Sequence, residues 1–325
     1  MKIVTIALMF LMFLFIGCEE DTPTEAEFMV TSVTTAPTLD GSGGDAAWAE
    51  ATDYVVTVGE GEDHANAFGV LDVTLTAVQT ASDLYIKAVW DDPSGTESVA
   101  KNEWGFADGA WGKSGNEDRL FFFFDMGLNG SQGADCAGMC HAGGDDEGMW
   151  TTNGKVDQWH WKAARSAPTH HADDKYIDNV YQNNDGSIKE DGGQHGDAKT
   201  IGLYNDNKAN DMPKYTAPLT DGFLILPAGE TDADVYFTAF DAATADESAT
   251  YRGYWLNANA DGSRADVTAY SSFSGGTWTV EFMRALDTGN DDDVVFGSGD
   301  VEITVAITDN SGGNHSGAPP FDMKF

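Results

Sequence analysis

Cys136 and Cys140 stand four positions apart in the segment CAGMCH, and His141 directly follows the second cysteine. Two thiols and an imidazole at this spacing suit three chemistries: attachment of a c-type haem, coordination of zinc, or a disulfide. In the first, the thiols would form two thioether bonds to the haem and His141 would be the proximal iron ligand. The familiar haem motif has two residues between its cysteines, whereas this segment has three.

Each of the other two chemistries leaves something unexplained. A structural zinc ion is almost always bound by four ligands. The third cysteine, Cys18, lies near the N-terminus, so no further cysteine is available to complete a zinc site. A disulfide between Cys136 and Cys140 suits an oxidising compartment, but it gives His141 no role. We therefore favour one covalently attached haem c, with the disulfide as the alternative.

A second iron ligand is expected from a His, Met or Lys side chain. In the segment VDQWHWKAAR (156–165), an extended backbone would place Gln158, His160 and Lys162 on one face and the two tryptophans on the other. His160 is therefore the first distal candidate. The competing interpretation is a hydrogen-bonded histidine that does not touch iron.

Met149 is the alternative distal ligand, since it follows His141 by eight residues in the same polar connection. Three residues from more distant segments are further candidates: Met212, Lys214 and His315. The remaining histidines are expected to have surface roles, and His170 and His171 in particular to form a solvated turn beside Asp173 and Asp174. His64 and His195 are also among the histidines expected at the surface.

Lys162 and Arg165 are two of only 17 basic residues and fall beside the expected site. In so acidic a chain they are natural partners for haem propionates through charge-assisted hydrogen bonds. The alternative is that they pair with Asp157 or Asp173 on the protein surface.

The segments around these residues predict a protein built mainly from β-strands. Most of them alternate or are rich in β-branched and aromatic residues, and Gly, Asp, Asn and Ser separate them. No stretch of helical length keeps a 3.6-residue period, so helices should be short and few. Nine strands are expected, at 53–58, 71–80, 83–90, 119–126, 156–165, 222–227, 235–240, 277–286 and 301–309.

This pattern predicts an all-β fold, an antiparallel β-sandwich with long loops. The polar connections 127–155 and 182–218 are too long for tight turns, and loops of that size are usually functional or mobile.

The N-terminus has the features of an export signal. One lysine precedes an apolar run that ends at Gly17-Cys18, and this run is too short to span a bilayer comfortably. Residues 1–17 are expected to be a signal peptide, 18–36 an acidic linker lipidated at Cys18, and 37–325 one β-sandwich domain that binds haem. The protein should then be exported and held in the bacterial cell envelope by the lipid on Cys18.

The charge of the chain excludes some partners. With 17 basic and 54 acidic residues, the net charge is -37. Such a surface repels nucleic acid and anionic lipid head groups, so neither is expected as a partner.

Several motifs together resemble the ethylbenzene-dehydrogenase-related haem-binding domain, the fold of the gamma subunits of some molybdenum oxidoreductases. They are spread over residues 36–317, and DQWHWKAAR after a Cys-His loop is the most specific. The motifs are APTLDGSGGDAAWAEA (36–51), EDRLFFFF, CAGMCH, DQWHWKAAR, WTVEFMRALDTG and VEITVAITDNSGGNHSG. The resemblance implies a sandwich like that of carbohydrate-binding modules and DOMON domains, with haem near one end.

The resemblance also implies a function, with one departure. The gamma subunits hold haem b without covalent bonds and use Met and Lys as axial ligands, so their ligands cannot be transferred to a chain that carries CAGMCH. We expect an electron-transfer protein rather than an enzyme with its own substrate. Its partner would be a redox protein such as a molybdenum oxidoreductase or a respiratory complex. The alternative is a carbohydrate-binding sandwich with a Cys136–Cys140 disulfide.

Overall fold

The computed structural model describes residues 26–60, 66–127, 133–140, 148–216 and 222–325. Within these residues the protein consists of 18 strands, two short α-helices and a few single 3-10 turns. The strands are β1 (Phe28–Ser32), β2 (Tyr54–Val58), β3 (Leu71–Gln79), β4 (Asp83–Asp91), β5 (Glu103–Ala107), β6 (Ala110–Ser114), β7 (Arg119–Asp125), β8 (Val156–Lys162), β9 (Asp173–Ile177), β10 (Gln194–Gly196), β11 (Tyr204–Asp206), β12 (Leu224–Leu226), β13 (Tyr254–Asn257), β14 (Thr268–Ser274), β15 (Thr277–Ala285), β16 (Val301–Thr308), β17 (Ser316–Gly317) and β18 (Phe321–Lys324). The helices are α1 (Cys136–Cys140) and α2 (Ala233–Tyr236).

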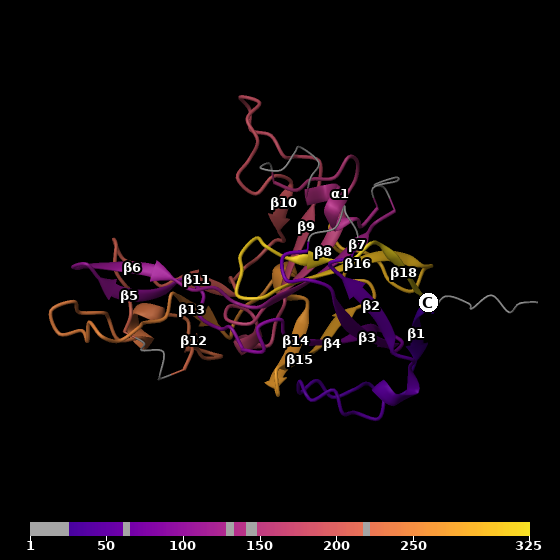
Figure 1. The fold of residues 1–325 in the computed structure, drawn as a ribbon, viewed down its shortest axis with the longest axis horizontal. Helices are drawn as coiled ribbons and strands as arrows, with labels where there is room; N and C mark the ends of the chain where they lie inside the picture. The colour runs from indigo at the N-terminus through magenta and orange to yellow at the C-terminus, as the bar shows by residue number, and fades with distance from the viewer. Residues whose placement is uncertain (1–25, 61–65, 128–132, 141–147, 217–221) are drawn as a thin grey trace, which may run out of the picture.

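Thirteen strands form one curled sheet that folds over on itself as a sandwich (Figure 1). Its first layer runs β10-β9-β8-β7-β16-β18, and its second layer contains β3, β4, β15 and β14, with β2 on the other edge of β3. Strand β1 joins the layers, because its first residues pair with β18 and its last three with β3. The predicted all-β sandwich is therefore confirmed. Both β1 pairings are parallel, whereas the rest of the curled sheet is antiparallel.

Aromatic side chains fill the space between the two layers. Trp161 of β8 lies edge-on to Trp90 of β4 and to Trp278 of β15, with ring centroids 6.0 and 4.9 Å apart. Phe122 of β7 packs against Phe282 of β15 at 5.4 Å. Fully burying each large aromatic contributes about 1.5–3 kcal/mol. These contacts fix which face of β7 and β8 points outward, and the candidate site lies on that outward face.

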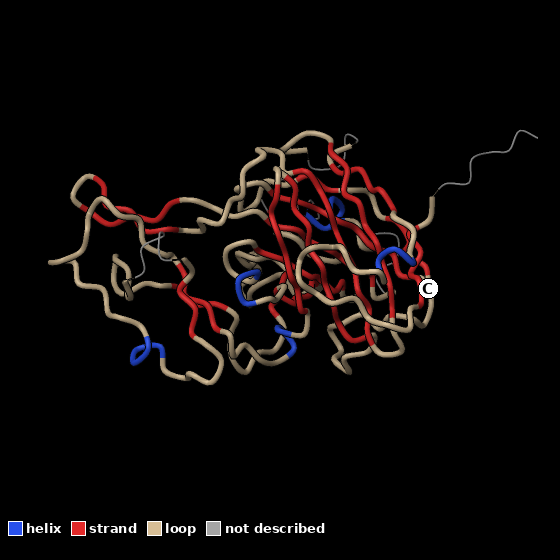
Figure 2. The backbone as a smooth tube through the Cα atoms, turned by 90° about the horizontal axis from the view of Figure 1, so that it is seen from below, coloured by secondary structure: helices blue, strands red, loops and turns tan. Residues whose placement is uncertain are grey.

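A side lobe projects from the sandwich, on the left of Figure 1, and is also separate in Figure 2. It contains the β5–β6 hairpin, the three-stranded sheet β11-β13-β12, and α2. Tyr215, Leu224, Leu226 and Phe237 form its own small core.

One predicted strand is wrong. The segment 235–240 was expected to be extended, but Ala233–Tyr236 forms a helical turn. Asp232 caps the turn, since its side chain accepts a hydrogen bond from the backbone N–H of Asp234 at 2.9 Å. A local cap thus outweighs the β-propensity of Val235, Tyr236 and Phe237.

No helix among the described residues is both long and apolar enough to cross a membrane. Cys18 and the signal segment lie outside the described residues.

Candidate functional site

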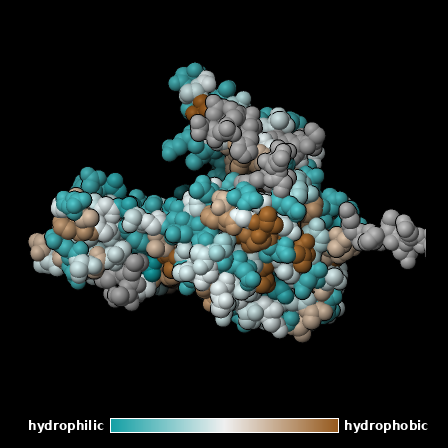
Figure 3. Space-filling model, viewed as in Figure 1, coloured by the Kyte–Doolittle hydropathy of each residue, from teal (hydrophilic) through white to brown (hydrophobic). Residues whose placement is uncertain are grey.

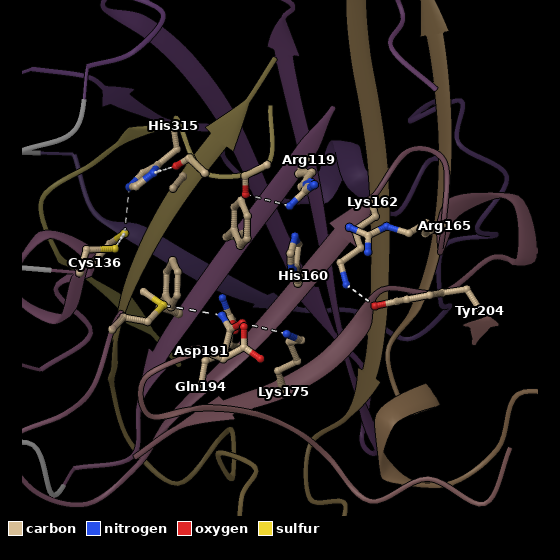
Figure 4. A pocket seen from close by; sticks show the side chains of 18 residues that line it. Arg119, Cys136, His160, Lys162, Arg165, Lys175, Asp191, Gln194, Tyr204 and His315 are labelled. Carbon is tan, nitrogen blue, oxygen red and sulfur yellow. Dashed lines mark hydrogen bonds between the residues drawn. The ribbon is translucent and has the colours of Figure 1, made fainter. Parts of the chain in front are cut away.

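A cavity of about 350 Å³ lies on the outward face of the first layer. Its floor is formed by side chains from β7, β8, β9, β10 and β16, and the opposite wall comes from α1, the segment before Trp150, and residues 312–315 (Figure 4). Strand alternation places Gln158, His160 and Lys162 on this floor, while Trp159 and Trp161 enter the core. The face assignment that the sequence predicts for this segment is present in the structure.

His160 lies in the middle of the floor and is only 6% exposed. Among the described residues, neither ring nitrogen has a hydrogen-bond partner. Burial, together with the nearby cations Lys162 and Arg119, holds the pKa of His160 well below its usual value, so the imidazole is neutral. A buried polar group without a partner costs about 1–3 kcal/mol. A neutral imidazole facing a cavity is a typical iron or zinc ligand.

Cys136 and Cys140 are the first and last residues of α1, and both line the cavity. Residues four apart lie on the same face of a helix, so the three-residue gap in CAGMCH directs both thiols to the same side. Their sulfurs are 4.0 Å apart, about twice the 2.05 Å of a disulfide bond. Contact with Cys140, and then burial, raises the pKa of the Cys136 thiol. The Cys136 thiol is therefore held protonated, whereas, against the effect of burial, contact with Cys140 raises the pKa of the neighbouring His315.

His315 reaches the same thiols from the loop after β16. Its Nε2 is 3.6 Å from Cys136 Sγ, and its Nδ1 lies 2.8 Å from the Gly313 carbonyl oxygen. Cys136, Cys140 and His315 each offer a ligand atom within 4.8 Å of the others. The structure therefore adds a third nearby ligand to the zinc interpretation. His141 lies outside the described residues.

Four cationic side chains line one end of the cavity: Arg119, Lys162, Arg165 and Lys175 (Figure 4). This is a local positive region in a chain of net charge -37. Lys175 Nζ donates to Gln194 Oε1 at 2.9 Å and forms no ion pair with a described residue.

The alternative pairing expected for Lys162, with Asp173, is present in the structure, but its location is corrected. Lys162 pairs with Asp173 and also donates to Tyr204 Oη at 2.9 Å, whereas Arg165 pairs with Glu117 at 2.6 Å. Asp173 was expected at the surface but is fully buried, as is Asp157, which pairs with Arg284 instead. Both cations therefore belong to a buried network and not to a solvated surface.

The structure separates the other predicted residues into two groups. Met149 and His315 line the cavity, and Met149 Sδ accepts a hydrogen bond from Gln194 Nε2 at 3.6 Å. Met212 and Lys214 do not line it, because their segment folds into the side lobe, where Lys214 pairs with Asp234 at 2.7 Å.

The remaining histidines are not cavity residues either. His170 is exposed and stacks on Tyr270, with ring centroids 4.1 Å apart, while His195 pairs with Asp178 at 3.0 Å. Burial lowers the pKa of His171, so the solvated turn expected there describes only His170. His64 lies outside the described residues.

Several cavity residues were not predicted from the sequence. Arg119 is two residues before Phe121, which lies opposite His160 in the neighbouring strand. Alternation along the expected strand 119–126 would therefore have placed Arg119 on the same face as Phe121 and His160. Lys175 pairs with Gln158 across β8 and β9, but the second of these strands was not predicted. The other missed residues are Phe121, Phe123, Asp191, Gln194, Tyr204, Ala306, Gly312 and Gly313.

The fold and the cavity together define a class: a β-sandwich protein with a cavity of about 350 Å³ on an outer sheet face, lined by thiols, imidazoles and cations. The chain belongs to the ethylbenzene dehydrogenase family, whose family model matches residues 45–319. No curated protein matches the chain.

Three solved structures are similar to this chain at a low level. Two are a carbohydrate-binding module of family 9 from Caldicellulosiruptor kristjanssonii. The complex with glucose has 8% sequence identity and a TM-score of 0.36, and the match covers 92% of this chain and 95% of that chain. The complex with cellotriose has 8% identity and a TM-score of 0.34, and the match covers 92% of this chain and 93% of that chain. The third is a putative carbohydrate-binding protein from Bacteroides uniformis ATCC 8492. It has 9% sequence identity and a TM-score of 0.37, and the match covers 91% of this chain and 89% of that chain.

Proposed function

We propose that this protein binds one haem in the outward cavity and transfers single electrons to or from a redox partner protein. One observation carries the proposal: His160 is buried with both ring nitrogens unpartnered among the described residues, and it shares the cavity with both thiols of CAGMCH. Membership of the ethylbenzene dehydrogenase family supports it.

Each wall of the cavity has a part in this proposal. Cys136 and Cys140 would attach the haem covalently, and His141 and His160 would be its axial ligands, with Met149 as the alternative to His160. The bound haem would supply reversible one-electron chemistry. The stacked rings of Phe121 and Phe123, whose centroids are 6.1 Å apart, offer an apolar wall.

The cations would bind the two propionates. Arg165 and Lys162 have this role in the sequence-based prediction, and the structure places Arg119 and Lys175 beside them. Lys175 is the best placed of the four, because its ammonium group has no ion pair with a described residue. Charge-assisted hydrogen bonds to carboxylates are about twice as strong as neutral ones.

The proposal includes the cellular context expected from the N-terminus. The protein would be exported, lipidated at Cys18 and anchored in the bacterial cell envelope, where its partner would be a redox protein such as a molybdenum oxidoreductase.

A metal site is the second candidate, because Cys136, Cys140 and His315 already lie within 4.8 Å of one another. Zinc in such a site would need a fourth ligand. The carbohydrate-binding alternative has less support. It calls for exposed aromatic rings, and all nine tryptophans are buried or half-buried.

Production with and without cytochrome c maturation machinery tests the proposal. We expect a pyridine haemochrome spectrum and haem retained on a denaturing gel only with the machinery. Cys140→Ser should lose the covalent haem, since one of its two thiols is gone. Met139→Leu in the same helix is the matched control and should keep it.

Three outcomes would contradict the proposal. Protein that stays colourless in a competent host would remove the haem, and full covalent attachment in Cys140→Ser would move the attachment site. About one equivalent of tightly bound zinc in colourless protein would favour the metal site of Cys136, Cys140 and His315.

A further inference from the structure

A second group of buried charges lies on the opposite face of the strands that form the cavity floor. Asp157 of β8 and Asp174 of β9 point toward the core, and Asp293 approaches them from the loop between β15 and β16. All three are at most 3% exposed, and each offers a carboxylate oxygen within 4.8 Å of the others. Asp293 forms a second such group with Asp197 and Asp292.

Hydrogen bonds from described residues reach only one oxygen of each carboxylate among Asp157, Asp174, Asp197 and Asp293. Asp174 Oδ1 accepts from the Lys175 N–H at 3.1 Å, and Asp197 Oδ2 accepts from Ser263 Oγ at 3.4 Å. Asp157 Oδ2 accepts from Arg284 Nη1 at 2.5 Å and from the Val294 N–H at 3.0 Å, and Asp293 Oδ2 accepts from Thr288 Oγ1 at 2.5 Å. Four other oxygens of this group are buried, and no described residue donates a hydrogen bond to them. They are Asp157 Oδ1, Asp174 Oδ2, Asp197 Oδ1 and Asp293 Oδ1. Leaving buried carboxylate oxygens without a partner is costly, and a bound cation would satisfy them.

The charges of the group do not balance. Arg284 is fully buried and lies 2.5 Å from Asp157 and 3.8 Å from both Asp174 and Asp293. One guanidinium facing three carboxylates leaves two negative charges. The group therefore needs protons or a further cation at neutral pH.

We propose that Asp157, Asp174, Asp197 and Asp293 bind a divalent cation, and that this cation is calcium. Every ligand is a carboxylate oxygen, the hard ligand that calcium prefers. Calcium binds oxygens at about 2.3–2.6 Å, so two ligands on opposite sides of it are about 5 Å apart. This matches the spread of up to 4.8 Å within each of the two groups, one of Asp157, Asp174 and Asp293 and the other of Asp197, Asp292 and Asp293, which share Asp293. Magnesium requires a tighter octahedral shell and keeps several waters, whereas zinc favours His and Cys.

The proposed ion would join parts of the chain that are distant in sequence. It would connect β8 and β9 to the β15–β16 loop, directly behind the floor that carries His160 and Lys175. Asp291 of that loop is a natural control, because its side chain is 98% exposed. This inference is independent of the proposed haem.

Chelator-treated mature protein, with whatever cofactor it carries, provides the test. We expect about one equivalent of calcium to bind in a titration and to raise the thermal midpoint, with magnesium much weaker. Asp174→Asn should weaken calcium binding by at least about tenfold, since even residues outside the first shell of a metal contribute that much. Asp291→Asn should bind calcium like the unaltered protein.

Asp197→Asn is the second variant, and it covers the case in which Asp174→Asn, at a fully buried position, fails to fold. The proposal is overturned if the unaltered protein contains no calcium after purification and its thermal midpoint does not respond to calcium. Magnesium that binds as tightly as calcium would overturn the assignment of the ion as calcium. Unchanged affinity in both Asn variants would place the ion elsewhere.

Discussion

His160 shows how one side chain gains a function from its surroundings. The strand sequence directs it to the outer face of β8, and the ring of Phe121 lies 4.0 Å from its own. Burial and four nearby cations then keep it neutral. Only a neutral imidazole has a lone pair to offer a metal, so these cations favour ligation even though they would repel a protonated ring.

Replacing His160 by alanine should convert a low-spin haem spectrum to high-spin, because the iron would lose its sixth ligand. Absorption spectra of the oxidised and reduced protein measure this. His195→Ala is the matched control, since His195 pairs with Asp178 away from the cavity, and it should leave the spectrum unchanged. A low-spin spectrum in His160→Ala would transfer the distal role to Met149 or His315.

At the scale of elements, a buried ion pair inside the side lobe joins the β5–β6 hairpin to the segment before β13. Glu103 of β5 accepts from Arg252 Nη1 at 3.2 Å and from the Gly253 N–H at 2.7 Å. Trp104 also exchanges backbone hydrogen bonds with Tyr251 at 2.8 and 2.9 Å. Burial, only partly opposed by Arg252, raises the pKa of Glu103 from 4.5 to about 7.

This raised pKa predicts how stability depends on pH. A folded state that holds a proton more tightly than the unfolded chain is favoured at low pH, so the contribution of Glu103 is complete below pH 4.5 and is lost as pH rises to about 7. The full shift from 4.5 to about 7 corresponds to at most about 3–4 kcal/mol. Glu103→Gln should flatten this part of the curve in denaturant unfolding between pH 4.5 and 7. Glu97→Gln, at an exposed position, should keep the slope.

If both variants lose the slope equally, or neither does, the assignment to Glu103 is wrong. The comparison depends on slopes and not on absolute stability, so a general weakening caused by leaving Arg252 without its carboxylate does not affect it.

The whole molecule combines a strongly acidic composition with a locally cationic cavity. Figure 3 shows hydrophilic residues over most of the visible face, with a small hydrophobic group on the sandwich. The net charge of -37 favours solubility but destabilises the compact state through self-repulsion. The cationic end of the cavity would attract an anionic cofactor against this background.

Raising the salt concentration should therefore stabilise the protein. The screening length falls from about 30 Å at 0.01 M to about 8 Å at 0.15 M, so the thermal midpoint should rise over that range. Sodium and potassium chloride should act alike, and sucrose of equal osmolality should reproduce little of the effect. A midpoint that is constant or falls with salt would show that attractive ion pairs outweigh the repulsion.

The sequence by itself determined the features that depend on local periodicity. Alternation along 156–165 predicted the faces of His160 and the tryptophans. The sandwich and most of its core strands follow from the same signal. No helix was predicted at Cys136–Cys140, and it is this helix that turns both thiols to one side. The local pattern was misleading at α2, where it predicted a strand and the helix cap of Asp232 favours a helical turn instead.

Only the tertiary structure decided which distant groups meet. His315 is 179 positions from Cys136, and Arg284 is 127 positions from Asp157. Lys175 enters the cavity through the register of β8 with β9. In a chain with 54 acidic residues, carboxylates come close together by chance, and burial is what distinguishes Asp157, Asp174 and Asp293. Periodicity reports the face of a strand, but strand pairing and packing between layers choose the residues that share that face.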